Sequence, residues 1–133
     1  MTISEYLAAA RQRLLAEPVV VSFAILRERA TPVDGHWRVK LSLSDGSALE
    51  FSEYMHVASG RRIVVVTYSY HWADAEDKLI SRWDNTPHFP GLPGFPHHIH
   101  DGPGDQVRSG QPTDFFAVLD EIVRRLSLLP QEG

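Results

Sequence analysis

The chain has 133 residues, 43% of them hydrophobic, and a formal net charge of -4 at pH 7. This length and composition fit one globular domain with a single core over residues 1–133. The absence of cysteine excludes disulfides, thiol nucleophiles and zinc–thiolate sites. No apolar run is long enough to cross a membrane, and the first residues lack the pattern of a secretory signal, so we expect a cytoplasmic protein.

The charges are unevenly distributed. Residues 1–70 carry eight Lys and Arg and seven Asp and Glu, whereas residues 71–133 carry five and ten, together with five of the seven histidines. An acidic chain is poorly suited to coating nucleic acid through a general positive field, although a small basic pocket remains compatible with it. Carboxylates and histidines in the same half of the chain favour acid–base chemistry or metal binding.

The first part of the sequence predicts a helix followed by strands. Thr2 and Glu5 have the spacing of a capping box, and apolar residues recur at helical spacing up to Pro18. A run of β-forming residues from Val19, and alternating apolar and polar residues in later segments, then predict strands. The predicted segments are a helix over 3–16 and strands over 19–29, 36–43, 49–57, 62–72 and 79–83. The strand over 62–72 begins apolar on both faces, so we expect it to be central.

Asp45 and Gly46 mark a hairpin between two of these strands. The apolar residues of the strands test the register of this hairpin. A three-residue loop over 45–47 pairs Leu43 with Leu49 and places apolar side chains opposite one another, whereas a two-residue loop mismatches the two faces.

Residues 84–111 are predicted to form a long, functional loop, because proline, glycine and histidine are dense there. Four apolar side chains favour an ordered loop that folds back along the sheet. They belong to Phe89, Leu92, Phe95 and Ile99.

Asp114 opens a second helix, which is expected to end at Pro130. The fold class is therefore α+β. We expect a mostly antiparallel, five-stranded meander with N- and C-terminal helices, in the order αβββββα.

Strong catalytic motifs such as a Walker loop are absent, so the candidate chemistry rests on histidines. In an extended segment, His98 and His100 point to one side and His97 to the other. Two imidazoles on one side can transfer protons or hold a metal ion. The alternative is that they only anchor a loop through hydrogen bonds.

Arg82 and Asp84 end the last predicted strand and point to one side. Arg82 is a candidate for binding a phosphate, and Asp84 for orienting a histidine or ligating a metal. A purely structural Arg–Asp pair is the alternative. We expect Asp84 to lie within direct or water-bridged reach of His71, His98 or His100.

Several aromatic residues are candidates for binding a substrate. Tyr70 and Trp72 lie on one face of the central strand, opposite His71, and could stack on nucleobases. Trp83 and His97 are further candidates for substrate contacts. Such aromatic stripes are also typical of a hydrophobic core.

Three blocks resemble the TumE family of toxins from prokaryotic toxin–antitoxin pairs. They are Tyr70-His71-Trp72-Ala73-Asp74, the string RWDN-x-PH over 82–88, and Phe95-Pro96-His97-His98-Ile99-His100. The resemblance is strongest over residues 68–100, and the C-terminal helix also fits. The family commonly has a basic residue within the histidine tract, where this chain has Ile99. The resemblance implies a growth-inhibiting toxin, neutralised by an antitoxin encoded beside it, and such antitoxins are often helix-turn-helix proteins.

The first hypothesis is a toxin that cleaves RNA without a cofactor. His98 and His100 transfer protons, Asp84 orients one of them, and Arg82 stabilises the charged phosphorane. A metal-dependent alternative uses Asp84, His98 and His100 as the ligands of a divalent ion.

The second hypothesis is a non-enzymatic binding protein. Its histidine- and proline-rich loop docks a protein partner through exposed aromatics such as Phe89 and Phe95. Histidines that converge on one cleft favour the enzyme, whereas histidines that point apart or are fully buried favour the binding protein.

Overall fold

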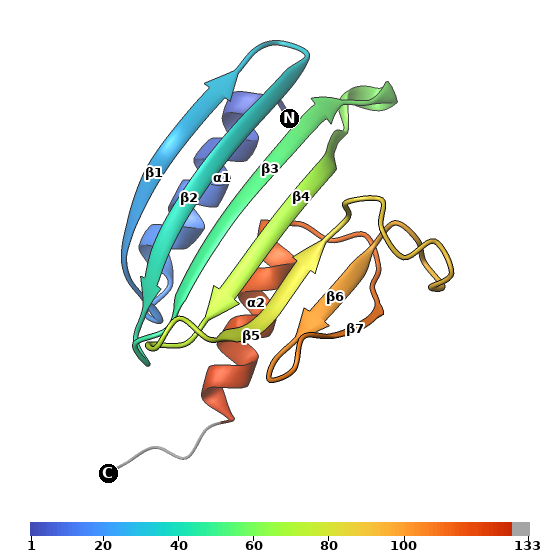
Figure 1. The fold of residues 1–133 in the computed structure, drawn as a ribbon. Coiled ribbons are helices and arrows are strands. Elements are labelled where there is room, and N and C mark those ends of the chain that lie inside the picture. The colour runs from blue at the N-terminus through green and yellow to red at the C-terminus, as the bar shows by residue number, and fades with distance from the viewer. Residues whose placement is uncertain (129–133) are drawn as a thin grey trace.

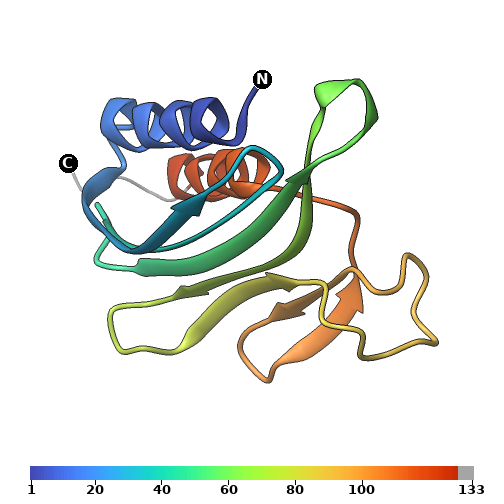
Figure 2. The same ribbon diagram turned by 90° about the horizontal axis from the view of Figure 1, so that it is seen from above.

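The computed structural model describes residues 1–128, which form a single sheet with both helices on one of its faces (Figures 1 and 2). The helices are α1 (Ile3–Ala16) and α2 (Phe115–Ser127). The strands are β1 (Val20–Ala30), β2 (Asp34–Leu43), β3 (Ala48–Val57), β4 (Ile63–Ala73), β5 (Leu79–Asp84), β6 (His98–Asp101) and β7 (Gln106–Ser109). A short 3-10 turn, η1 (Ser59–Arg61), joins β3 to β4.

The strands follow one another in chain order across the sheet, and every neighbouring pair is antiparallel. The predicted α+β class, the meander and the helices at both ends are therefore confirmed. The prediction of five strands is wrong, because the sheet has seven. β4 is the fourth of the seven, as its two apolar faces indicate.

The two additional strands lie inside the predicted loop, residues 84–111. β6 and β7 have four residues each, which is too short for a clear alternation of apolar and polar side chains. The prolines and glycines around them also favour a loop. Only residues 85–97 form an irregular connection, which carries Phe89 and Phe95.

This connection folds back only in part. The ring of Phe89 packs edge-on against His98, with 5.2 Å between the ring centroids. Phe89 and Phe95 nevertheless remain 41% and 43% exposed, so the prediction that their burial holds the segment along the sheet is wrong. Ile99, which lies within β6, does pack against the core.

Both helices begin at the predicted caps. Thr2 and Glu5 form a complete capping box, and the Asp114 side chain accepts a hydrogen bond from the N–H of Ala117. α2 ends at Ser127, and Pro130, its predicted end, lies outside the described residues. No helix within residues 1–128 is long and apolar enough to span a membrane.

The hydrophobic core lies between the helices and the inner face of the sheet. The alternation in β2 is confirmed, because Trp37, Val39, Leu41 and Leu43 are all buried. The hairpin that follows has a three-residue loop, but it covers residues 44–46, and Leu41 pairs with Leu49. The predicted register is therefore wrong by two residues, a shift that leaves every side chain on its predicted face.

One charged residue lies inside this core. Glu53 is fully buried and accepts hydrogen bonds from the hydroxyls of Tyr6 and Tyr70, from Trp37 Nε1 and from the N–H of Phe115. Four donors from two strands and both helices thus converge on one carboxylate. Its burial raises its pKa, and the hydrogen bonds oppose that effect.

Candidate functional site

The register of three strands places the candidate residues in two adjoining rows. Asp84 on β5 pairs with His98 on β6, and Arg82 pairs with His100 on one side and with His71 on the other. Directly paired residues share a face of the sheet. All five side chains therefore lie on the outer face, which neither helix covers (Figure 2).

Four of these five side chains, all but His98, line an open hollow of about 310 Å³ on the outer face. Its lining consists of His71, Leu79, Arg82, Asp84, Thr86, His88, His100 and Asp105. The hollow thus collects residues from β4, β5, β6, the β5–β6 connection and the β6–β7 turn, among them three histidines and two carboxylates.

Asp84 is the centre of the cluster. Its Oδ1 atom lies 3.6 Å from His98 Nε2, and its Oδ2 atom accepts a hydrogen bond of 3.1 Å from Arg82 Nε. One ligand atom each from Asp84, His98 and His100 lie within 4.8 Å of one another. The prediction that Asp84 lies within reach of a histidine is therefore confirmed, whereas the roles of these residues stay predictions.

Hydrogen bonds at Nδ1 hold the imidazole rings of His98 and His100 in their orientation. His98 Nδ1 lies 2.9 Å from the carbonyl oxygen of Pro96, and His100 Nδ1 lies 2.8 Å from Asp105 Oδ1. A carbonyl oxygen and a carboxylate only accept hydrogen bonds, so Nδ1 is the protonated nitrogen in both rings. The Nε2 atoms therefore carry the lone pair when the rings are neutral.

Asp84 is held as a carboxylate although it is 4% exposed. Its burial raises its pKa, but the hydrogen bond from the N–H of Thr86 and the charges of Arg82 and His98 outweigh burial and lower the pKa overall. An ionised carboxylate beside two imidazoles can orient a histidine or bind a cation.

His97 lies away from this cluster, as alternation predicts. Its Nδ1 atom is 2.7 Å from the hydroxyl of Tyr68, and the two rings stack. Desolvation, with a smaller effect of His98, lowers the pKa of His97. Tyr68, its partner on β4, lies on the helix-covered face of the sheet. The structure therefore does not bring His97 together with His98 and His100.

The aromatic candidates for substrate binding belong to the core. Tyr70, Trp72 and Trp83 are 0%, 2% and 7% exposed. Tyr70 bonds to Glu53, and Trp72 Nε1 donates to Ser47 Oγ. Their ring faces are covered by the helices, which leaves no surface on which a nucleobase could stack. The core alternative accounts for them, and the substrate-stacking interpretation does not fit their burial.

Some residues around the hollow are absent from the sequence predictions. Arg38 lies on β2, and a second hollow of about 250 Å³ includes Arg38 together with His71 and Arg82. The polar face of the alternating strand over 36–43 is the sequence signal that could have identified Arg38. Asp105 and His88 lie in turns without such a pattern, so only the fold places them at the site.

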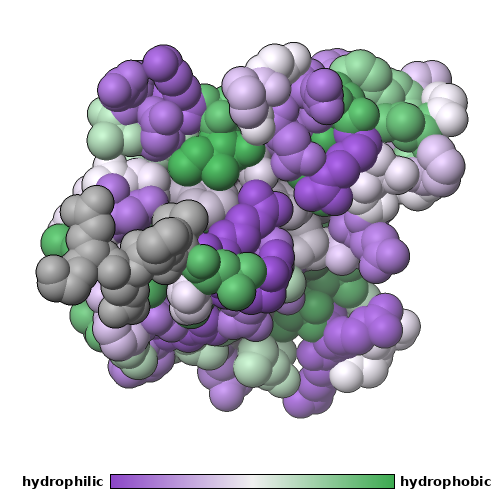
Figure 3. All heavy atoms as spheres, turned by 90° about the horizontal axis from the view of Figure 1, so that it is seen from below, coloured by the Kyte–Doolittle hydropathy of each residue, from purple (hydrophilic) through white to green (hydrophobic). Residues whose placement is uncertain are grey.

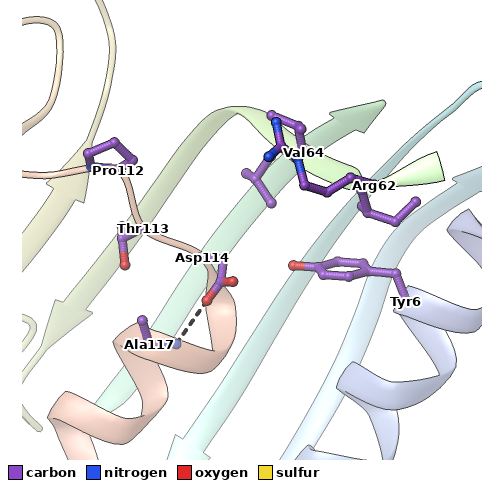
Figure 4. Close-up of a pocket in the computed structure, with 9 residues that line it drawn as sticks. Tyr6, Arg62, Val64, Pro112, Thr113, Asp114 and Ala117 are labelled. Atoms are coloured by element: carbon purple, nitrogen blue, oxygen red, sulfur yellow. Dashed lines mark hydrogen bonds between the residues drawn. The ribbon is translucent and has the colours of Figure 1, made fainter. Parts of the chain in front are cut away.

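A further hollow, of about 380 Å³, lies on the other side of the sheet between α1, β4 and the start of α2 (Figure 4). Its polar side chains come from Tyr6, Arg62, Thr113 and Asp114. The carboxylate of Asp114 caps α2, and the Tyr6 hydroxyl bonds to Glu53. These two groups already serve the fold, and the lining contains no histidine and one carboxylate, so this hollow holds no second cluster comparable to the one around Asp84.

Comparison with known proteins supports the resemblance in the histidine tract. The family model described as "Toxin TumE" matches residues 10–127, which is most of the chain. No curated protein and no solved structure matches the chain. The match supports a toxin of a toxin–antitoxin system, with a cognate antitoxin as its partner. The chain belongs to the TumE family of toxins.

Proposed function

We propose that this toxin inhibits growth by cleaving RNA at the outer-face site. The observation that carries the proposal is the convergence of Asp84, His98 and His100 within 4.8 Å of one another, with Asp84, His100 and the neighbouring Arg82 lining one open hollow. Carboxylate, imidazole and guanidinium groups are the side chains that phosphodiester cleavage requires. An outer face without helices leaves room for a polymeric substrate.

Arg82 is suited to binding a phosphate. Its side chain is 41% exposed, and within the described residues only its Nε atom has a hydrogen-bond partner, Asp84. The two η nitrogens remain for the oxygens of a phosphodiester. Arg38 and His71 line the adjoining hollow, which places a second arginine near Arg82, and Glu50 in the same hollow pairs with Arg38. The two arginines offer local phosphate contacts in a protein whose net charge is negative.

The proposed reaction is an intramolecular transesterification. The 2′-oxygen of a ribose forms a bond to the adjacent phosphorus while the bond from phosphorus to the 5′-oxygen breaks. A base on the protein takes the hydroxyl proton, and an acid returns a proton to the leaving 5′-oxygen. The products are a 2′,3′-cyclic phosphate and a 5′-hydroxyl, and Arg82 stabilises the charge on the phosphorane.

The accessibility of each histidine determines whether it can transfer these protons. His98 is 2% exposed, with Nδ1 bonded and Nε2 facing Asp84. It therefore lacks the access that a group exchanging protons with a substrate needs. His71 and His88 line the open hollow and are better placed for proton transfer.

A second candidate function is suggested by the exposed aromatics. Phe89 and Phe95 project from the β5–β6 connection, and exposed rings of this kind anchor protein partners. In this reading the connection docks a protein, such as the antitoxin, for which we propose a helix-turn-helix fold. The ring of Phe89 is also packed against His98, which links this surface to the site.

The test is induced expression in a host without the antitoxin, with total RNA analysed after growth arrest. The wild type should arrest growth and yield RNA fragments with 2′,3′-cyclic phosphate ends, whereas Arg82→Ala should permit growth and leave RNA intact. Arg124→Ala, at an exposed position on α2 on the opposite side of the sheet, is the matched control and should behave like the wild type. Arrested wild-type cells with intact RNA would exclude cleavage of RNA as the toxic activity.

A further inference from the structure

We infer that Asp84, His98 and His100 bind one divalent transition-metal ion. The three side chains offer one oxygen and two nitrogens, all within 4.8 Å of one another. Tetrahedral ligands of a zinc ion lie about 3.4 Å apart, given bond lengths of about 2.0 to 2.2 Å. The 3.6 Å between His98 Nε2 and Asp84 Oδ1 already matches that separation. The third ligand atom, from His100, lies within 4.8 Å of the other two, so metal binding requires this ring to move closer together with the exposed Asp105 side chain that holds it.

The hydrogen bonds behind the histidines support this inference. Histidine ligands of metals almost always donate their other ring N–H to a carbonyl or carboxylate oxygen, which fixes the ring. His98 makes this contact with Pro96 and His100 with Asp105, at 2.9 and 2.8 Å. Both imidazoles are therefore oriented with Nε2 available as a metal ligand. A loop anchored only by hydrogen bonds would not require the same nitrogen to be available in both rings.

The contacts of Asp84 give a second argument. With His98 neutral, its Nε2 lone pair faces Asp84 Oδ1 at 3.6 Å, and both atoms are acceptors in a buried place. A cation between the two atoms would satisfy both acceptors. A proton on His98 would serve two of the three groups, whereas a metal ion serves Asp84, His98 and His100 together. The carboxylate is held in place by Arg82 Nε, which donates to Oδ2, and by the N–H of Thr86, which donates to the same Oδ1 atom that faces His98.

The ligand types select the class of metal. Mg²⁺ and Ca²⁺ bind oxygen ligands, whereas imidazole suits zinc and the divalent ions of iron, cobalt and nickel. Three protein ligands leave coordination positions for water or substrate, and two of the three, Asp84 and His100, lie on the wall of the open hollow. This arrangement is typical of a catalytic metal and not of a closed structural site.

The role of the ion in catalysis rests on the proposed function. A bound metal polarises a phosphate oxygen and lowers the pKa of a coordinated water. It would replace His98 and His100 as the proton-transfer pair, and His71 and His88 would remain for that role. Binding itself is independent of the reaction and can be measured without RNA.

The experiment is calorimetric titration of the purified, tag-free chain with Zn²⁺ after treatment with EDTA. We expect one Zn²⁺ per chain and no competition from millimolar Mg²⁺. His98→Ala and His100→Ala should each weaken binding by at least a factor of 10, and Asp105→Ala by about 10- to 100-fold through loss of its hydrogen bond to His100. His56→Ala changes an exposed histidine on β3 and should bind like the wild type.

Circular dichroism checks that each variant is folded, and His100→Ala, at the more exposed ligand, decides the matter if His98→Ala does not fold. Wild-type protein that binds no Zn²⁺, or variants that bind it as tightly as the wild type, would overturn the inference. The two proposals fail separately. If Arg82→Ala is no longer toxic and the wild type binds no Zn²⁺, the proposal of RNA cleavage stands and the metal site does not. If the wild type binds Zn²⁺ specifically and Arg82→Ala is fully toxic, only the metal site stands.

Discussion

The Nε2 atom of His98 lies 3.6 Å from Oδ1 of Asp84, and both residues are almost completely buried on the outer face of the sheet. Two interpretations of this contact differ in their energetics. As a buried ion pair with a protonated His98, it holds two elements of the fold together. As part of a metal site, it places two acceptors opposite one another, which destabilises the protein without the ion.

Asp84→Asn distinguishes the two interpretations. An amide that donates to His98 Nε2 no longer accepts from the N–H of Thr86, so at pH 8 without metal we expect a loss of at most about 1.5 kcal/mol in the free energy of unfolding. Breaking a buried ion pair would instead cost about 3 to 5 kcal/mol. Urea denaturation measures this difference, and a loss of the larger size would favour a structural pair. Toxicity should be lost in either case.

The strands up to β5 could be predicted from the sequence because each alternates over enough residues. The contact between Asp84 and His98 could be anticipated only in part. Alternation predicts that His98 and His100 share a side, but their pairing with β5 depends on the backbone register of β6. That register depends on contacts such as Ile99 with the core, and a four-residue strand among prolines gives no local sign of them.

The aromatic residues show where the sequence is ambiguous. An alternating stripe such as Tyr70 and Trp72 fits a stacking platform and a core equally well. The position of the two helices decides between them, because both cover the face that carries these rings. No pattern within β4 itself indicates which of its faces the helices cover.

Phe89→Ala tests the link between the β5–β6 connection and the site. The ring contacts His98 and His100, with centroid distances of 5.2 and 5.9 Å, and its removal exposes both imidazoles to water. Because Phe89 is 41% exposed, we expect a loss of about 1 kcal/mol or less in stability, but a decrease of about 10-fold in Zn²⁺ affinity together with weaker toxicity.

Phe95→Ala is the matched control, since Phe95 is similarly exposed and makes no ring contact with either histidine. It should retain Zn²⁺ affinity and toxicity. Equal loss of toxicity in both variants, with unchanged metal affinity, would instead favour the second candidate function, in which the two rings dock a protein partner.

Glu53→Leu should destabilise the fold strongly. The change leaves four buried donors without an acceptor: the hydroxyls of Tyr6 and Tyr70, Trp37 Nε1 and the Phe115 N–H. Each unsatisfied group costs about 1 to 3 kcal/mol, so we expect a total loss of at least about 3 kcal/mol in urea denaturation. Glu50→Leu lies three residues earlier, on the outer face, and should change stability by about 1 kcal/mol or less. Equal effects of the two changes would contradict the role of Glu53.

The last prediction concerns Glu121 and the stability of the protein in acid. Hydrogen bonds from Arg124 and Arg125 lower the pKa of Glu121 to about 2, from an ordinary value of 4.5. A carboxylate with a lowered pKa stabilises the folded state fully above its unfolded pKa, and this contribution is lost as the pH falls through the folded pKa. The contribution of Glu121 should therefore be complete at pH 7 and disappear between about pH 4.5 and 2.

Glu121→Gln isolates this contribution, because the effects of other carboxylates such as Glu53 cancel in the comparison with the wild type. We expect the wild type to be more stable by about 1 kcal/mol or less at pH 7, since the pair is partly exposed, and the two proteins to be equally stable near pH 2. A difference that does not depend on pH would contradict the prediction.

The contact between Glu121 and Arg125 matters for the site because it orients Arg125. Arg125 donates to Ser81 Oγ at 2.8 Å and lies over the rings of Trp72 and Trp83. Ser81 directly precedes Arg82 on β5, so this arginine fixes α2 against the strand that carries Arg82 and Asp84.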